Sequence, residues 1–171
     1  MATPTNLPAA QTTGNVLTAA YMNDLRGAFR VLQVVSAIYS TQVSNSTSTP
    51  ADTGLTATIT PQSTSSKILV IVNQAGCSKS SGNLNNAMRL SLLRNGVVEI
   101  FIADGAGYTA TALALNFGTL SCSYLDSPGT TSAVTYKTQF FNVGIAAASV
   151  SVQTTFATNP TSTITLMEIS A

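Results

Sequence analysis

Charged side chains are scarce in this sequence, and histidine and tryptophan are missing altogether. Seven lysines and arginines and six aspartates and glutamates make up 8% of the 171 residues, against about 25% in a typical globular domain. A net charge of +1 cannot drive binding through phosphate neutralisation, so we expect no nucleic-acid partner. The absence of histidine removes the most common general base and metal ligand of proteins.

Long hydrophobic segments and cysteine motifs are missing as well. The longest aliphatic run, residues 68–72, is far too short to span a membrane, and the N-terminal residues lack the features of a secretory signal. Cys77 and Cys122 form no metal-binding motif, and the sequence leaves open whether they are two buried thiols or one disulfide. We therefore expect no membrane insertion and no bound metal.

No arrangement of residues points clearly to an enzyme. The serine-nucleophile motifs G-x-S-x-G and S-x-x-K are absent, and there is no histidine to activate a serine. Asp104 and Asp126 are the least implausible carboxylate pair for glycoside hydrolysis, but turn formation at the ends of predicted strands explains both residues better. Gly105-Ala106-Gly107 matches the start of a dinucleotide-binding loop, without the helix that such a loop requires. We expect neither catalysis nor a cofactor.

The sequence is instead rich in hydroxyl side chains and in alternating patterns, with 46 serines and threonines and 44% hydrophobic residues. From Val31 onward, hydrophobic and polar residues alternate with a period of two, as in half-buried strands, most cleanly at 55–60. Asn95-Gly96 accepts the backbone angles of a type I′ turn and predicts a hairpin between 88–93 and 97–102. Further strands are predicted at 67–73, 119–125, 134–141, 149–156 and 163–169.

Together with the alternating residues from Val31 onward, these segments amount to nine or ten short strands in about 140 residues, without intervening helices. Such spacing is typical of an all-β fold, an antiparallel sandwich or jelly roll of about ten strands. We place this β-domain at residues 34–171 and treat residues 1–33 as an N-terminal anchoring arm and helix.

The N-terminal segment differs from the rest in composition and period. Residues 1–16 are uncharged and contain Pro4, Leu7 and Pro8, which favours an extended arm, either a loose tail or an anchor on a neighbouring protein. Thr18 is a good N-cap for the short helix that follows, which either caps its own domain or meets equivalent helices of sister chains. Its hydrophobic stripe consists of Leu17, Tyr21, Leu25, Phe29 and Leu32.

The shortage of charge predicts self-association. A soluble monomer usually keeps like-signed surface charge, whereas residues 31–51 and 138–167 contain no charge at all. Small uncharged side chains can be buried between subunits at little desolvation cost. We therefore expect a homo-oligomer with contacts along the sandwich, closed into a ring with the N-termini at one end.

Several segments resemble a known group of proteins. Gly14–Gln33, which contains Val16-Leu17-Thr18-Ala19-Ala20 and then Asn23, resembles the N-terminal segment of small virion proteins of tailed bacteriophages, including cyanobacterial and marine phages. The segments 52–61, 66–70 and 124–128 are similar to the same group. The β-domain is also similar in layout to the jelly rolls of the complement C1q and tumour-necrosis-factor group, which are trimers.

What this resemblance implies is a homotrimer on the exterior of a virion, made in the host cytoplasm. In one alternative, the protein is a tail-fibre or tail-tip component that anchors by its N-terminal segment and touches a host-surface glycan or protein with its β-head. In the other, it is a capsid decoration protein whose arm staples major capsid subunits. Its partners are then further copies of itself and other virion proteins, and no binding residues carry over.

Overall fold

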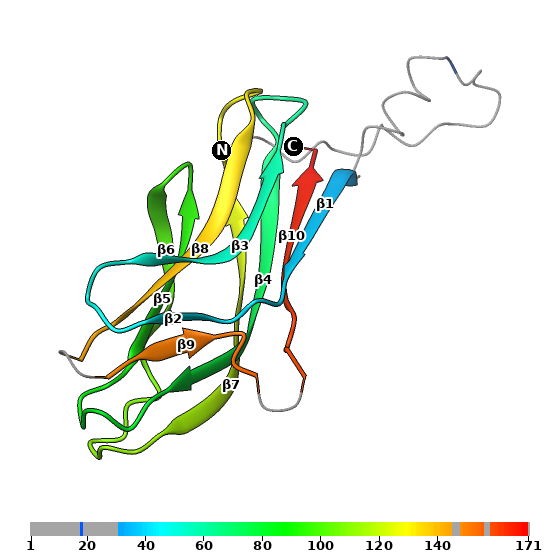
Figure 1. Cartoon of the computed structure of the whole chain (residues 1–171). Coiled ribbons are helices and arrows are strands. Elements are labelled where there is room, and N and C mark those ends of the chain that lie inside the picture. Colours follow the sequence, from blue (N-terminus) through cyan, green and yellow to red (C-terminus); the bar gives the residue numbers. More distant parts are fainter. Residues whose placement is uncertain (1–17, 19–30, 145–147, 156–157, 171) are drawn as a thin grey trace, which may run out of the picture.

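The computed structural model describes residues 18, 31–144, 148–155 and 158–170, and this part of the chain is built from strands (Figure 1). The all-β class predicted from the sequence is confirmed. The strands are β1 (Val31–Tyr39), β2 (Val43–Asn45), β3 (Ala51–Ile59), β4 (Lys67–Lys79), β5 (Met88–Arg94), β6 (Val97–Ala106), β7 (Leu115–Asp126), β8 (Val134–Asn142), β9 (Val150–Val152) and β10 (Ser162–Ile169).

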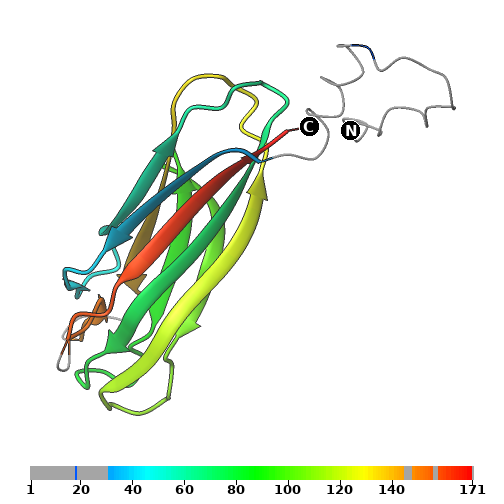
Figure 2. The same ribbon diagram turned by 90° about the vertical axis from the view of Figure 1, so that its right-hand side faces the viewer.

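The strands form two antiparallel sheets that pack face to face (Figures 1 and 2). In the six-stranded sheet, β1 pairs with β10, β10 pairs with β4, and β7 lies along the other side of β4. Beyond the end of β10, β9 takes its place beside β4, and β2 pairs with β9. The four-stranded sheet has the order β3-β8-β5-β6.

The strand pairing is that of one long hairpin rolled into a jelly roll. The outermost strands β1 and β10 pair first, followed by β3 with β8, β4 with β7, and β5 with β6 at the tip. Successive pairs alternate between the two sheets. Among the two architectures predicted from the strand spacing, the topology is therefore the jelly roll.

Two hydrophobic clusters fill the space between the sheets. In the larger cluster, Leu55 and Ile59 of β3 pack with Val70 of β4 and with Ile164 and Leu166 of β10, each at most 1% exposed. Full burial of one such side chain contributes about 1.5–3 kcal/mol, so these strands hold the two sheets together. The smaller cluster contains Cys77, Met88, Leu90, Phe140, Val150 and Val152.

The predicted hairpin is confirmed at its turn. Asn95 and Gly96 have φ angles of 48° and 86°, and Arg94 pairs with Val97 on either side of them. Positive φ at both central residues is what a two-residue type I′ turn requires. The turn residues therefore set the pairing at this end of β5 and β6, and the register shifts at three points farther along the two strands.

Two strands end elsewhere than predicted because of local backbone geometry. β4 continues past Asn73 to Lys79, because Gly76, at a φ of 62°, forms part of a bulge after which pairing with β7 resumes. β9 occupies only three residues of the predicted 149–156 strand, because Gln153 has a φ of 51° and leaves the extended conformation.

The junction between the two predicted segments also lies elsewhere. Leu32 belongs to β1, so its assignment to the helical stripe is wrong, and the boundary between residues 33 and 34 falls inside this strand. The reason is long-range: β1 pairs with β10 along nearly its whole length, and these hydrogen bonds outweigh a local helical pattern. The β-domain therefore includes Val31.

Candidate functional site on the outer face of the six-stranded sheet

The outer face of the four-stranded sheet carries balanced ion pairs. Of the 13 charged residues, ten lie in the described part of the chain. Lys137 of β8 pairs with Asp52 of β3 at 2.8 Å, and Arg89 of β5 pairs with Asp104 of β6 at 2.7 Å. The hydrogen bond from Arg89 lowers the pKa of the Asp104 carboxyl. These ion pairs are accessible to water, since the side chains of Asp52 and Asp104 are more than half exposed.

Two aromatic rings on the same face contact the guanidinium group of Arg89. The guanidinium carbon of Arg89 lies 5.1 Å from the ring centroid of Phe101 and 5.3 Å from that of Phe141. These distances are within the range of cation–π attraction. Phe101, although 57% exposed, is thus part of a mixed charged and aromatic surface.

Three more charged residues form a cluster between the sheets at one end of the sandwich. Arg94, the last residue of β5, contacts Asp126 of β7 and Glu99 of β6, each at 2.9 Å. Tyr136 of β8 donates a hydrogen bond to Asp126 at 2.5 Å. Burial raises the pKa of Tyr136, and its bond to Asp126 raises it further, so the phenol remains a donor. The cluster ties β7 of one sheet to three strands of the other.

Two other buried charges are held by neutral groups. Gln33 Nε2 and the backbone N–H of Gln62 donate to the carboxylate of Glu168 at 2.6 Å and 2.7 Å. Burial by itself raises the pKa of Glu168, but the hydrogen bonds outweigh it and the pKa is lowered. Lys79, which is 3% exposed, donates to Thr109 Oγ1 at 2.5 Å. The charges of Glu168 and Lys79 are thus both satisfied by hydrogen bonds within the fold.

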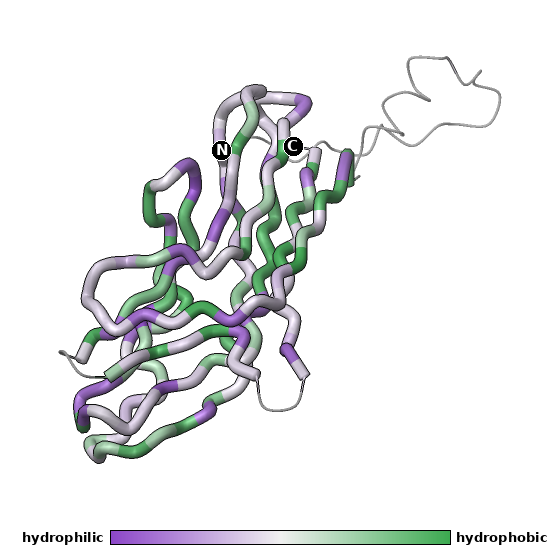
Figure 3. The backbone as a smooth tube through the Cα atoms, in the orientation of Figure 1, coloured by the Kyte–Doolittle hydropathy of each residue, from purple (hydrophilic) through white to green (hydrophobic). Residues whose placement is uncertain are grey.

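The outer face of the six-stranded sheet is hydrophobic toward the end where β1 begins. Val34, Met167, Leu69 and Leu125 are successive cross-strand partners on β1, β10, β4 and β7. Residues paired in this way share one face, and Val34 and Leu125 are 56% and 51% exposed, so the row faces outward. Figure 2 shows the four strands side by side, and Figure 3 shows hydrophobic segments along β1, β10 and β4.

Further hydrophobic residues lie on the same face, next to this row or, in the case of Ile38, two rows farther along β1 beside Thr163 and Asn73. Ile38 is 70% exposed and Val31 is 46% exposed, both on the edge strand β1. Among the described residues, the only charge that strand alternation places on this face is Lys67, at its rim, which donates to Ser127 at 2.9 Å. We call the following eight residues the apolar patch: Val31, Val34, Ile38, Leu69, Ile71, Leu125, Met167 and Ile169.

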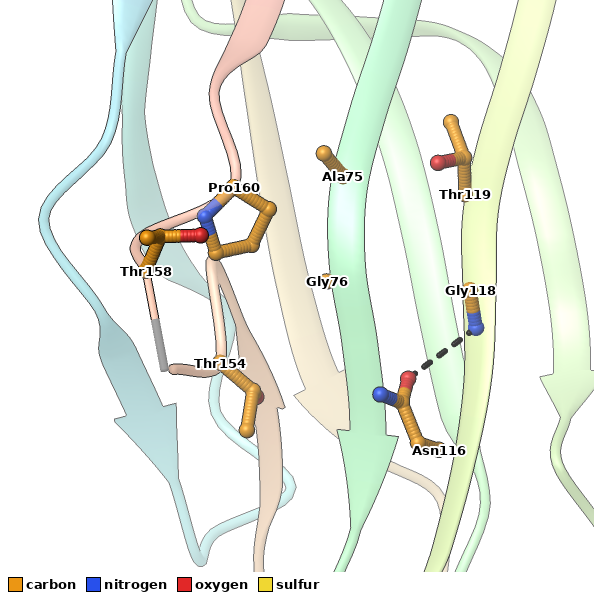
Figure 4. A pocket seen from close by; sticks show the side chains of 8 residues that line it. All are labelled: Ala75, Gly76, Asn116, Gly118, Thr119, Thr154, Thr158 and Pro160. Atoms are coloured by element: carbon orange, nitrogen blue, oxygen red, sulfur yellow. Dashed lines mark hydrogen bonds between the residues drawn. The ribbon is translucent and has the colours of Figure 1, made fainter. Parts of the chain in front are cut away.

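An open pocket of about 400 Å³ lies farther along the six-stranded sheet, where β4, β7 and the β9–β10 connection meet (Figure 4). Asn116 Oδ1 accepts a hydrogen bond from the N–H of Gly118 at 3.1 Å, along one wall. None of the described residues that line the pocket is titratable, so it offers only hydroxyl, amide and hydrocarbon contacts. Its lining is Ala75, Gly76, Asn116, Gly118, Thr119, Thr154, Thr158 and Pro160.

The structure does not unite the residues considered for catalysis. Asp104 lies on the outer face of the four-stranded sheet, whereas Asp126 lies between the sheets, and each has its own arginine. Cys77 and Cys122 are both free thiols, and burial raises the pKa of Cys77 to about 12. Within the described ranges, no group of three His, Cys, Asp or Glu side chains could hold a metal, and no helix could cross a membrane.

The residues predicted to join subunits or to anchor the chain stay predictions, with one exception. Leu32, as described above, lies in β1 instead of a helix. The others lie outside the described residues: Pro4, Leu7, Pro8, Leu17, Tyr21, Leu25 and Phe29.

The apolar patch was missed by sequence reasoning, although β1 contained a signal. Val35, Ala37 and Tyr39 pack against the core, and the alternate positions Val34 and Ile38 are hydrophobic as well. A strand with one face in water normally carries polar residues on that face. Val34 and Ile38, on either side of Ser36, were therefore the signal that the outer face of β1 is largely hydrophobic.

No protein-family model and no curated protein matches this chain. Among solved structures, the chain is similar to the VP2 subviral particle of infectious bursal disease virus, with 11% sequence identity and a TM-score of 0.42. The similarity covers 80% of this chain and 38% of the VP2 chain, so the chain spans well under half the length of that protein. A likeness this distant carries no conclusion about function, which rests on the chain's own residues.

Proposed function

We propose that this protein is a non-enzymatic structural component on the exterior of a tailed-phage virion, assembled as a homotrimer. Its role is that of a tail-fibre or tail-tip protein, anchored through residues 1–33, with the β-sandwich directed toward the host surface. The segments that resemble phage virion proteins support this role, as does the jelly roll without a catalytic constellation among its described residues.

The observation that carries the proposal is the distribution of charge. A catalytic acid or base needs a titratable group in reach of substrate, commonly with its pKa shifted toward neutrality. Here the carboxylates serve ion pairs and hydrogen bonds, and one sheet face is left almost without charge. The engaged carboxylates of the described chain are Asp52, Glu99, Asp104, Asp126 and Glu168.

A trimer of such heads acts through avidity instead of chemistry. Three identical heads on one stem convert the second and third contacts with a repetitive host surface into intramolecular events. Weak neutral contacts of the kind that hydroxyl and amide side chains offer are then sufficient in sum. The host partner is accordingly a surface glycan or protein with repeated copies.

Copy number in purified particles tests the location. A tail-fibre or tail-tip protein is expected at a few to tens of copies per virion, measured by gel densitometry against the major capsid protein. Hundreds of copies would instead identify the alternative, a capsid decoration protein. Absence from purified particles would contradict both virion roles.

Deletion of residues 2–16 tests the anchor. The shortened protein is expected to fold and to form the same oligomer, but not to enter particles when it replaces the full chain. Normal incorporation would show that the anchor lies elsewhere.

Replacement of Leu25 and Phe29 by Asp tests whether the predicted helix joins sister chains. We expect loss of the trimer in light scattering, because two carboxylates would then lie in the hydrophobic stripe. A trimer that survives both substitutions would exclude the helical contact.

A further inference from the structure

We propose that the apolar patch, on the outer face of β1, β10, β4 and β7, is the surface on which a second copy of this chain packs. The inference rests on the proposed homo-oligomeric role and adds to it the face, the residues and the orientation of the contact. It assigns the four-stranded sheet, with its ion pairs, to the outside of the assembly.

The exposure of the patch is the first argument. Ile38, Val34 and Leu125 are 70%, 56% and 51% exposed, and Leu69 and Met167 join the last two into one row across the sheet. Monomeric soluble proteins rarely leave large contiguous hydrophobic surfaces in water, and such surfaces commonly mark interaction sites. The row crosses four paired strands, whereas the exposed hydrophobic residues of the other sheet, such as Val97, are confined to the edge strand β6.

The size of the face is the second argument. Four strands about 4.8 Å apart lie side by side along the 13 residues of β4, with β10 and β1 beside residues 67–73 and β9 and β2 beside its other end. At about 3.3 Å per residue they describe a face of about 800 Å², roughly half of it at the hydrophobic end. A stable protein–protein interface buries about 800 Å² on each partner. The outer face of the six-stranded sheet therefore provides the area that contact with one copy needs, with hydrophobic residues at one end and small hydroxyl residues beyond them.

The charge of the face indicates a copy of this chain as its occupant. Nucleic acids and anionic lipid surfaces are bound through several lysines or arginines, whereas the described part of this face has only Lys67 at its rim. When a surface packs against a copy of itself, both copies carry the same charges, so any charge on that surface is opposed by a like charge. The near absence of charge here, beside ion pairs on the opposite sheet, meets that condition.

The residue next to the patch on β7 is held in place by contacts between the two sheets. Leu125 points outward, and the next residue, Asp126, points inward to Arg94 and Tyr136. The ionic cluster thus fixes the end of β7 that carries one side of the patch. A surface that is ordered before binding loses less conformational entropy on association.

The test compares equally exposed valines on the two sheets, in the full-length protein. Val34→Glu, alone and together with Leu125→Glu, places a carboxylate in the proposed contact. Val97→Glu introduces the same side chain at a 66% exposed position of β6 and is the matched control. Molar mass by light scattering over a concentration series is expected to show association weakened at least tenfold by Val34→Glu, and single 17.6 kDa chains for the double variant. Val97→Glu is expected to keep the wild-type mass.

The outcomes separate this inference from the proposed function. A multimeric wild type whose mass is unchanged in Val34→Glu and in the double variant overturns the patch but leaves the homo-oligomer standing. A wild type of 17.6 kDa at all concentrations overturns the homo-oligomer itself. A variant that keeps its mass but melts at a lower temperature than Val97→Glu also overturns the inference, because the patch is then covered by its own chain. Should Val34→Glu fail to fold, Ile38→Glu, at the most exposed patch residue, takes its place.

Discussion

The close approach of the β9–β10 connection to β4 makes Gly76 the most constrained glycine of the pocket. A Cβ atom at this position would lie 2.6 Å from Pro160 Cγ and 2.7 Å from the backbone nitrogen of Thr154. The same backbone nitrogen donates to the carbonyl of Gly76 at 3.0 Å. Because one obstacle is backbone, the chain cannot yield by turning a side chain, and the hydrogen bond must lengthen.

The loss of stability caused by Gly76→Ala has two parts, backbone strain and overpacking, and a matched control separates them. Gly129 has a φ of 65°, close to the 62° of Gly76, but no heavy atom lies within 4 Å of its added Cβ. Gly129→Ala therefore measures the left-handed backbone alone, about 1–2 kcal/mol. Gly76→Ala adds the overpacking of a filled site, about 1–3 kcal/mol, for a total of about 2–5 kcal/mol.

Urea unfolding of both variants, followed by circular dichroism at one fixed protomer concentration, measures the difference. We expect Gly76→Ala to have a lower free energy of unfolding than Gly129→Ala by about 1–3 kcal/mol. The lower conformational entropy of an unfolded chain with alanine applies to both variants and cancels. Equal unfolding midpoints would refute the close approach and, with it, this wall of the pocket.

Three other predictions concern the interior. Asp126→Asn removes one of the two carboxylates that pair with Arg94, leaves Glu99 in place, and is expected to lower the free energy of unfolding by about 1–3 kcal/mol in the same urea assay; no measurable loss would contradict a stabilising cluster. Because hydrogen bonds outweigh burial and lower the pKa of Glu168, its contribution to stability is present above about pH 4.5, its ordinary pKa, and is lost as the pH falls below it. Glu168→Gln should therefore flatten the dependence of stability on pH in this acid range, and an unchanged slope would exclude Glu168 as a source. Burial raises the pKa of Cys77 to about 12, so Ellman's reagent should react with this thiol only after unfolding, when two thiols per chain are titrated; immediate reaction of both thiols in the native protein, or fewer than two thiols after unfolding, would be inconsistent with the structure, since only Cys122 is partly exposed.

Predictions from the sequence were correct where a local structure is determined by residues adjacent in the chain. Asn95-Gly96 determines its turn through its own backbone angles, and the hairpin around it forms as predicted. The end of β4 was misplaced, since Gly76 indicates a turn locally but serves a bulge that only pairing with β7 sustains. Leu32 was misassigned for the same reason, because β10, far away in sequence, pairs with the strand that contains it.

The candidate site was less accessible to sequence reasoning than the fold. Asp104 and Asp126 were considered together because each lies at the end of a predicted strand. Their two strands, however, belong to different sheets, and the sheet decides which residues each carboxylate contacts. Arg94 reaches Asp126, 32 positions away in sequence, only because β5 and β7 lie in opposing sheets at the same end of the sandwich. No sequence spacing encodes such a pair.

The sequence by itself determined the class of fold, the number of strands, one hairpin and the lack of ionic groups, because each follows from side-chain chemistry and from a period of two. Only the tertiary structure decided which side of each strand meets the core. Residues 68–72 are hydrophobic on both sides, and nothing local distinguishes Leu69 and Ile71 from Ile68, Val70 and Val72. The second sheet makes the difference, because it covers one face of β4 and not the other.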